Sequence, residues 1–180
     1  MPVFADTETI GIYSVAHKLI NIITTLLILL SSIFGPAFAR AAAAHNLQGL
    51  KSLLARTRLI SISLFGPAAV ILLFLDETLA RLFNVPHAEL SMFMIILVAG
   101  QLVNAATGLS GILLNLTGAA RIEWRLSFLS LCIALLLSAP VGWSHGAAGL
   151  AVLFSTVIAF KHIASWLAAQ RHLKIGIFNP

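Results

Sequence analysis

The sequence predicts an all-α polytopic membrane protein, a bundle of five transmembrane helices plus one short cytoplasmic interfacial helix in a single domain over residues 1–180. Of the 180 residues, 59% are hydrophobic and only 9% are charged, whereas soluble domains carry roughly 25% charged residues. Several apolar runs reach the ~20 residues that a helix needs to cross the hydrocarbon core. The basic residues give a net charge of +5, but they fall in short loops between the apolar runs. That placement is typical of membrane topology and not of a nucleic-acid-binding surface.

The five predicted spans cover about residues 10–33, 59–75, 90–116, 126–141 and 147–169. Gly35-Pro36 is expected to end the first span, because proline interrupts helical hydrogen bonding. Pro67 lies in the middle of the second span and leaves the carbonyl of Ser63 without its usual partner, so we expect a kink there.

The segment between the first two spans, residues 39–58, is too short and too polar to span. Leu47, Leu50 and Leu54 share one helical face, and basic residues accompany them. This pattern is typical of a helix in the membrane interface, or of a basic extension of the second span. Asn46 is the predicted N-cap.

Charges at the predicted span ends set the orientation. The positive-inside rule assigns the more basic end to the cytoplasm, so the N-terminus is expected outside and the C-terminus inside. Trp124, Trp143 and Trp166 lie near span ends, where aromatic side chains anchor helices. The basic end holds Arg40, Lys51, Arg56, Arg58, Arg121, Arg125, Arg171 and Lys174 with the acid Glu123, and the other end holds Asp6, Glu8, Asp76, Glu77 and Glu89 with the base Arg81.

The third span carries a stripe of polar and small residues. Their spacing of three, four, three and four places them on one face of a helix. An amide without a partner in lipid costs several kcal/mol, so this face should meet other helices or a watery cavity. Close helix packing and a cavity lining both remain open. The stripe consists of Gln101, Asn104, Gly108, Gly111 and Asn115.

The first span carries a second polar face, with His17 and Asn21 beside Lys18. A lysine inside a span is costly unless it is hydrated, paired or able to snorkel. We expect Lys18 to face a cavity or ligand, the alternatives being snorkelling or a structural hydrogen bond. For Lys161 in the last span, snorkelling or a structural hydrogen bond is preferred to a cavity or ligand role. His17 is expected to be a packing residue, with a proton relay as the alternative.

The five predicted spans contain no Asp or Glu. A cavity furnished with a lysine, amides and hydroxyls suits an anionic ligand such as a phosphate. No histidine or cysteine pair has zinc-ligand spacing, and no phosphate-binding Gly-Lys-Ser/Thr loop occurs. We therefore expect no enzyme activity, no metal and no cofactor.

Four stretches resemble one protein family. They are Gly11-Ile-Tyr-Ser-Val-Ala-His-Lys18 with Gly35-Pro36-Ala-Phe-Ala39, then Leu50-Lys-Ser-Leu-Leu54, then Gly100-Gln-Leu-Val-Asn104 with Asn115-Leu-Thr-Gly118, and Pro140-Val-Gly-Trp-Ser-His-Gly-Ala-Ala148. Together they are similar to the C-terminal half of polysaccharide and O-antigen flippases of the multidrug/oligosaccharidyl-lipid/polysaccharide exporter superfamily. The resemblance covers about residues 8–170.

The resemblance implies a lobe of a transporter with twelve spans in two six-helix lobes around a central cavity, working by alternating access. This chain would match the last five helices, with the N-terminal lobe of the same transporter as its partner. The implied substrate is a polyprenyl-diphosphate-linked oligosaccharide, carried across the cytoplasmic (inner) membrane of a bacterium among membrane lipids. The cavity candidates are Lys18, His17, Asn21, Gln101 and Asn104. A cation-coupled multidrug exporter lobe and an inactive or scaffolding truncation product are the alternatives.

Overall fold

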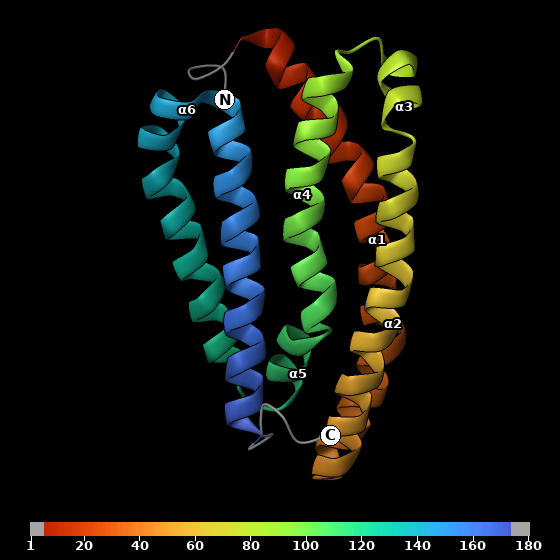
Figure 1. The fold of residues 1–180 in the computed structure, drawn as a ribbon. Coiled ribbons are helices and arrows are strands. Elements are labelled where there is room, and N and C mark those ends of the chain that lie inside the picture. Colours follow the sequence, from red (N-terminus) through yellow and green to blue (C-terminus); the bar gives the residue numbers. More distant parts are fainter. Residues whose placement is uncertain (1–5, 174–180) are drawn as a thin grey trace.

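The computed structural model describes residues 6–173, which form helices and no strand. This result confirms the predicted all-helical class. Four of the helices, α1, α2, α4 and α6, are long and apolar enough to cross a membrane, and Figure 1 shows them side by side in an elongated bundle. The elements are α1 (Thr7–Ala43), α2 (Leu47–Phe74), α3 (Asp76–Phe83), α4 (His87–Thr107), α5 (Ser110–Leu116) and α6 (Ala120–His172).

Helix α6 is a hairpin of two legs. At Gly146 the backbone leaves the helical region, with φ 57° and ψ −148°, a conformation that favours glycine. The first leg, residues 120–145, runs up the edge of the bundle, and the second leg, residues 147–172, returns between the first leg and α4 (Figure 1). The two runs predicted at residues 126–141 and 147–169 therefore lie in separate legs.

Helix α1 does not end at Gly35-Pro36, and that prediction is wrong. The helix continues to Ala43 with Pro36 inside it, because a proline removes only one backbone hydrogen bond and an apolar helix can absorb that loss. Pro67 is likewise held inside the continuous helix α2.

The predicted separate interfacial helix is also wrong, because residues 47–58 form the first turns of α2. Leu50 and Leu54 are almost completely buried and pack in one cluster with Phe38 and Leu113. Their shared face thus packs against other helices and not against lipid. The segment is a basic extension of the second span, which was the alternative prediction. Asn46 caps this helix as predicted, since its Oδ1 accepts a hydrogen bond from the Gly49 N–H at 2.8 Å.

The predicted span over residues 90–116 is interrupted. Gly108 has φ 63° and ψ −152°, so α4 ends at Thr107 and the short helix α5 begins at Ser110. The last carbonyls of a helix lack intrahelical partners, and Arg58 Nε donates to the carbonyl of Ala106 at 2.9 Å. The break divides the predicted polar stripe between α4 and α5.

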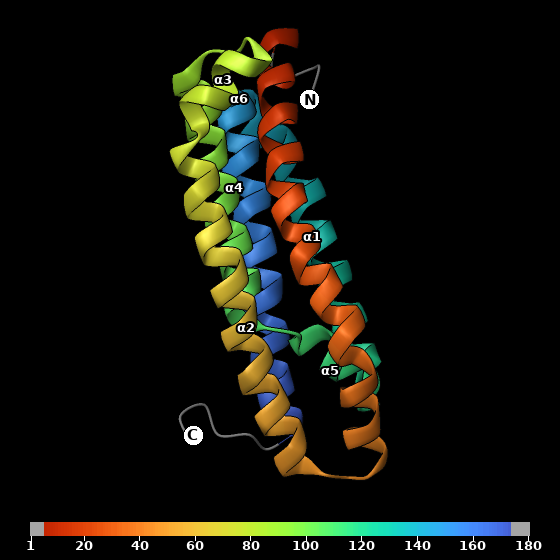
Figure 2. The same ribbon diagram turned by 90° about the vertical axis from the view of Figure 1, so that its right-hand side faces the viewer.

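Two buried apolar clusters hold the bundle together. The larger lies among α1, α2, α4 and the start of the second leg of α6, and includes Ile20, Phe65 and Phe93. The smaller joins the end of α1 and the start of α2 to α5 and the end of α6. Figure 2 shows α5 near the α1–α2 turn, with α3 at the opposite end beside the start of α1.

Candidate functional site

A cavity with both polar and apolar side chains in its walls lies between α1, α4 and the second leg of α6. Its volume is about 310 Å³. Tyr13, His17 and Asn21 follow one another at four-residue intervals and so project from the same face of α1. We call this the polar cavity. Its walls are Tyr13, His17, Ile20, Asn21, Leu97, Gln101, Phe154, Ser155 and Ile158.

The α1 wall of the polar cavity is ordered by contacts between its own side chains. The ring of Tyr13 stacks on His17 at a centroid distance of 5.9 Å and meets Phe93 edge-on at 5.5 Å. Asn21 Nδ2 lies 3.2 Å from His17 Nδ1. Because an amide N–H can only donate, Nδ1 is the acceptor and Nε2 carries the imidazole proton.

Helix α4 contributes an amide to the opposite wall. Gln101 Oε1 accepts a hydrogen bond from Asn104 Nδ2 at 3.0 Å, which fixes the Gln101 amide and leaves its NH₂ group for a ligand. Asn104 lies one turn further along α4 and does not line the polar cavity. Ser155 Oγ donates to the carbonyl of Ile96 at 2.6 Å, so this hydroxyl joins the second leg of α6 to α4.

The structure brings three of the five predicted site residues, His17, Asn21 and Gln101, to the polar cavity. Lys18 is exposed, on a side of α1 that does not line the cavity. Among residues 6–173, no hydrogen bond or ion pair reaches its ammonium. A ligand role for Lys18 therefore needs a surface outside the polar cavity, and it stays a prediction.

A buried ionic cluster lies where the two legs of α6 approach α5. Glu123, expected in a loop at the basic end, is only 7% exposed. Its Oε1 lies 2.5 Å from Lys161 Nζ, and its Oε2 accepts a hydrogen bond from Ser165 Oγ at 2.6 Å. We call Glu123, Lys161 and Ser165 the Glu123 cluster. The cluster gives Lys161 a structural partner, one of the two roles (snorkelling or a structural hydrogen bond) that the sequence favoured over a ligand role.

The sequence indicated a non-ligand role for Lys161 but did not indicate that Glu123 is its partner. Lys161 and Ser165 are one turn apart, which indicates a shared face, but Glu123 is 42 residues from Ser165. Only the tertiary fold brings the carboxylate to them. Trp166, which is expected in an aromatic belt, packs against Arg58, whose guanidinium lies 5.5 Å from the ring centroid; its place in a belt stays a prediction.

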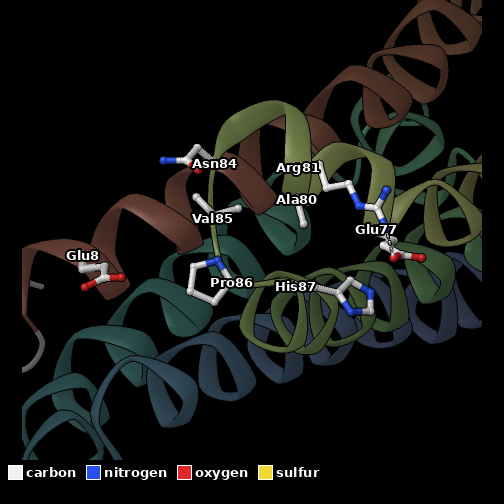
Figure 3. Close-up of a pocket in the computed structure, with 8 residues that line it drawn as sticks. All are labelled: Glu8, Glu77, Ala80, Arg81, Asn84, Val85, Pro86 and His87. Carbon is white, nitrogen blue, oxygen red and sulfur yellow. Dashed lines mark hydrogen bonds and ion pairs between the residues drawn. The ribbon is translucent and has the colours of Figure 1, made fainter.

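A third feature is an open cavity of about 500 Å³ beside α3 (Figure 3). Two of its wall residues form an ion pair, with Arg81 Nη2 2.6 Å from Glu77 Oε1 and both side chains largely exposed. A third wall residue, His87, has its Nε2 3.1 Å from Asp76 Oδ2. A side-chain hydrogen bond from Ser91, with His87 nearby, lowers the pKa of Asp76. Exposed pairs of this kind contribute little to stability, and we regard this cavity as a surface feature.

The fold defines a class: a helical protein in which four helices are long and apolar enough to cross a membrane, which suggests a multi-pass membrane protein. Among residues 6–173, no group of three or more His, Cys, Asp or Glu side chains is placed to hold a metal ion. Comparison with family models, curated proteins and solved structures finds no match to this chain.

Proposed function

We propose that the chain is part of a membrane transporter that moves an anionic, lipid-linked oligosaccharide, as its resemblance to polysaccharide flippases implies. The polar cavity is the observation that carries the proposal. It places a phenol, an imidazole and two amides among helices that are otherwise apolar. Polar side chains inside membrane-spanning helices are rare, and they commonly mark substrate paths.

The proposal includes five crossings: α1, α2, α4 and each leg of α6. Trp124 and Trp143 support this placement, being 66% and 74% exposed on the first leg of α6. At 1.5 Å per residue, 143 − 124 = 19 residues span about 28 Å, close to the ~30 Å hydrocarbon core. Tryptophans favour the two membrane interfaces. With the α1–α2 turn in the cytoplasm, the positive-inside rule gives an N-out, C-in chain.

The size of the polar cavity limits what it can hold. Ligand cavities commonly measure about 300–1,000 Å³, and one of about 310 Å³ accommodates a group the size of a single sugar. Neutral amides and hydroxyls suit sugar hydroxyls. The diphosphate would then bind beside the cavity, on the exposed side of α1, where Lys18 and Thr25 form a polar strip with Asn21, which also lines the cavity. Such a strip is poorly suited to lipid and fits a chamber completed by another lobe.

The alternative of a cation-coupled multidrug exporter has less support. A cationic drug needs an available carboxylate. The buried carboxylate in the described helices, Glu123, is already neutralised by Lys161.

The cavity half of the proposal is tested by Gln101→Leu in the full-length protein. The substitution keeps the side-chain size but removes the amide that faces the cavity. We expect at least a tenfold loss of surface polysaccharide in cells that depend on this protein, measured by gel electrophoresis of extracted polysaccharide. Leu102→Ala, a truncation of the partly exposed neighbour, is the matched control and should leave the output unchanged. Equal output from both variants would contradict a substrate role for the cavity.

Lys18 is tested separately by Lys18→Ala in the same cells. If Lys18 neutralises the diphosphate, surface polysaccharide is abolished while protein expression stays normal, as measured by immunoblot. Ile22→Ala is the control, because Ile22 lies one turn away on the same side and is 67% exposed. Normal polysaccharide from the Lys18 variant would remove Lys18 from the binding surface and leave the polar cavity as the substrate site.

A further inference from the structure

A second cavity, distinct from the polar cavity, lies at the basic end of the bundle. It occupies about 520 Å³ between the α1–α2 turn, the end of α5 and the end of α6. Its walls are largely apolar, including Ala42, Leu50 and Leu116, and it also contains two imidazoles, His45 and His172. We call it the histidine cavity.

The two imidazoles are held differently. His172 Nε2 donates to the carbonyl of Thr117 at 3.2 Å, which fixes the ring against the end of α5. Among residues 6–173, Nδ1 of His172 makes no hydrogen bond, and it can donate to a phosphate oxygen when the ring is an imidazolium with both N–H groups. His45 is exposed in the α1–α2 turn, with φ 50°. Both rings thus offer nitrogen atoms beside an apolar cavity.

The charge around the histidine cavity is positive. Arg40, Lys51 and Arg171 are exposed on the segments that form the cavity, each within one or two residues of a wall residue. All six acids of the chain lie within the described residues, and the one at this end, Glu123, is buried and paired with Lys161. No exposed carboxylate side chain within residues 6–173 therefore competes for these cations.

The depth of the cavity follows from the proposed membrane placement. Thr117 precedes Trp124 by 124 − 117 = 7 residues, on the side away from the bilayer centre. The histidine cavity therefore lies at the level of the lipid headgroups on the cytoplasmic side, where basic pockets between helices bind anionic headgroups.

We propose that the histidine cavity binds one anionic phospholipid, with its phosphate at His45 and His172 and its glycerol and upper acyl chain against the apolar walls. The charge of the surroundings selects an anionic lipid over a zwitterionic one, and the apolar walls select a lipid over free phosphate. The inference rests on the membrane placement in the proposed function, but not on transport. The site would anchor the α1–α2 turn to the ends of α5 and α6.

Retention of phosphatidylglycerol and phosphatidylcholine by the purified chain in detergent, measured by native mass spectrometry, tests the proposal. We expect one retained phosphatidylglycerol, with at least fivefold lower retention of phosphatidylcholine. His45→Asn with His172→Gln should reduce phosphatidylglycerol retention to the phosphatidylcholine level. Asparagine is chosen at position 45 because it tolerates the left-handed conformation. His145→Gln, at the opposite end of the bundle, is the matched control and should retain the lipid.

Two further measurements test whether the cavity itself holds the lipid and whether free phosphate can take its place. Ala42→Phe keeps both imidazoles but fills the cavity, so it should also abolish retention, and circular dichroism checks that each variant is folded. Inorganic phosphate at millimolar concentration should not displace the lipid. Equal retention of the two lipids, full retention by the double histidine variant or by Ala42→Phe, or complete displacement by phosphate would each overturn the proposal. Because retention is read from purified protein, it is independent of whether polysaccharide transport occurs.

Discussion

Lys161→Met is expected to lower the free energy of unfolding by about 3–5 kcal/mol, because it removes one partner of a buried ion pair. The methionine fills much the same space, but Glu123 is left without its cation in a site where it is only 7% exposed. The hydrogen bond from Ser165 remains, but a hydroxyl cannot neutralise a carboxylate. Unfolding in mixed micelles, followed by circular dichroism as denaturant is added, measures the loss.

A double variant separates the effect of the unpaired charge from the effect of changed packing. Glu123→Gln combined with Lys161→Met removes both charges, and the pair should recover most of the stability lost in Lys161→Met. Lys51→Met is the control: Lys51 is exposed on the basic extension of α2, and its substitution should change stability by no more than about 0.5 kcal/mol. If Lys161→Met behaved like Lys51→Met, the Glu123 cluster would have no role in holding the fold.

The Glu123 cluster joins the two legs of α6 through polar contacts and packs against α5. Glu123 belongs to the first leg of α6, while Lys161 and Ser165 belong to the second. A Cβ atom added to Gly111 of α5 would lie 2.7 Å from Glu123 Oε1, so α5 packs directly on the carboxylate. The cluster therefore fixes the open end of the α6 hairpin against the α4–α5 break, and we assign it a structural role.

The local features of this bundle were accessible from sequence. Long apolar runs predict helices, and the Asn46 cap needs only the three residues that follow it. The four-residue spacing of Tyr13, His17 and Asn21 indicates a shared face, and all three line the polar cavity.

What could not be predicted depends on packing between distant segments. From the sequence alone, Gly108 is compatible with a continuous helix over residues 90–116. In the structure the helix ends before Gly108, and Arg58 of α2 donates a hydrogen bond to the free carbonyl of Ala106. Whether Leu50 faces lipid or protein is likewise decided by Phe38 and α5. The predicted end of the first helix at Pro36 was wrong, because rules for proline derived from soluble helices overstate how often it ends an apolar helix.

Gly100→Ala is expected to lower the free energy of unfolding by about 1–3 kcal/mol, the usual range for overpacking a close contact. Gly100 is buried where α4 meets the second leg of α6. An added Cβ would lie 2.3 Å from Ser155 Oγ and 2.9 Å from the Ser155 carbonyl oxygen. Since the second clash is with backbone, Ser155→Ala should not rescue the variant, and the two helices must separate.

Gly11→Ala is the matched control for this effect. A Cβ at Gly11 meets nothing within 4 Å, so alanine should stabilise α1 by up to about 1 kcal/mol through helix propensity. The same micelle unfolding measurement covers both variants, and a Gly100→Ala protein as stable as Gly11→Ala would show that α4 and α6 do not need this close approach. Because Gln101 and Ser155 both line the polar cavity, separation of the helices at Gly100 also displaces two of its walls. If the protein has the proposed transport function, Gly100→Ala should therefore reduce surface polysaccharide even at a temperature where the variant remains folded.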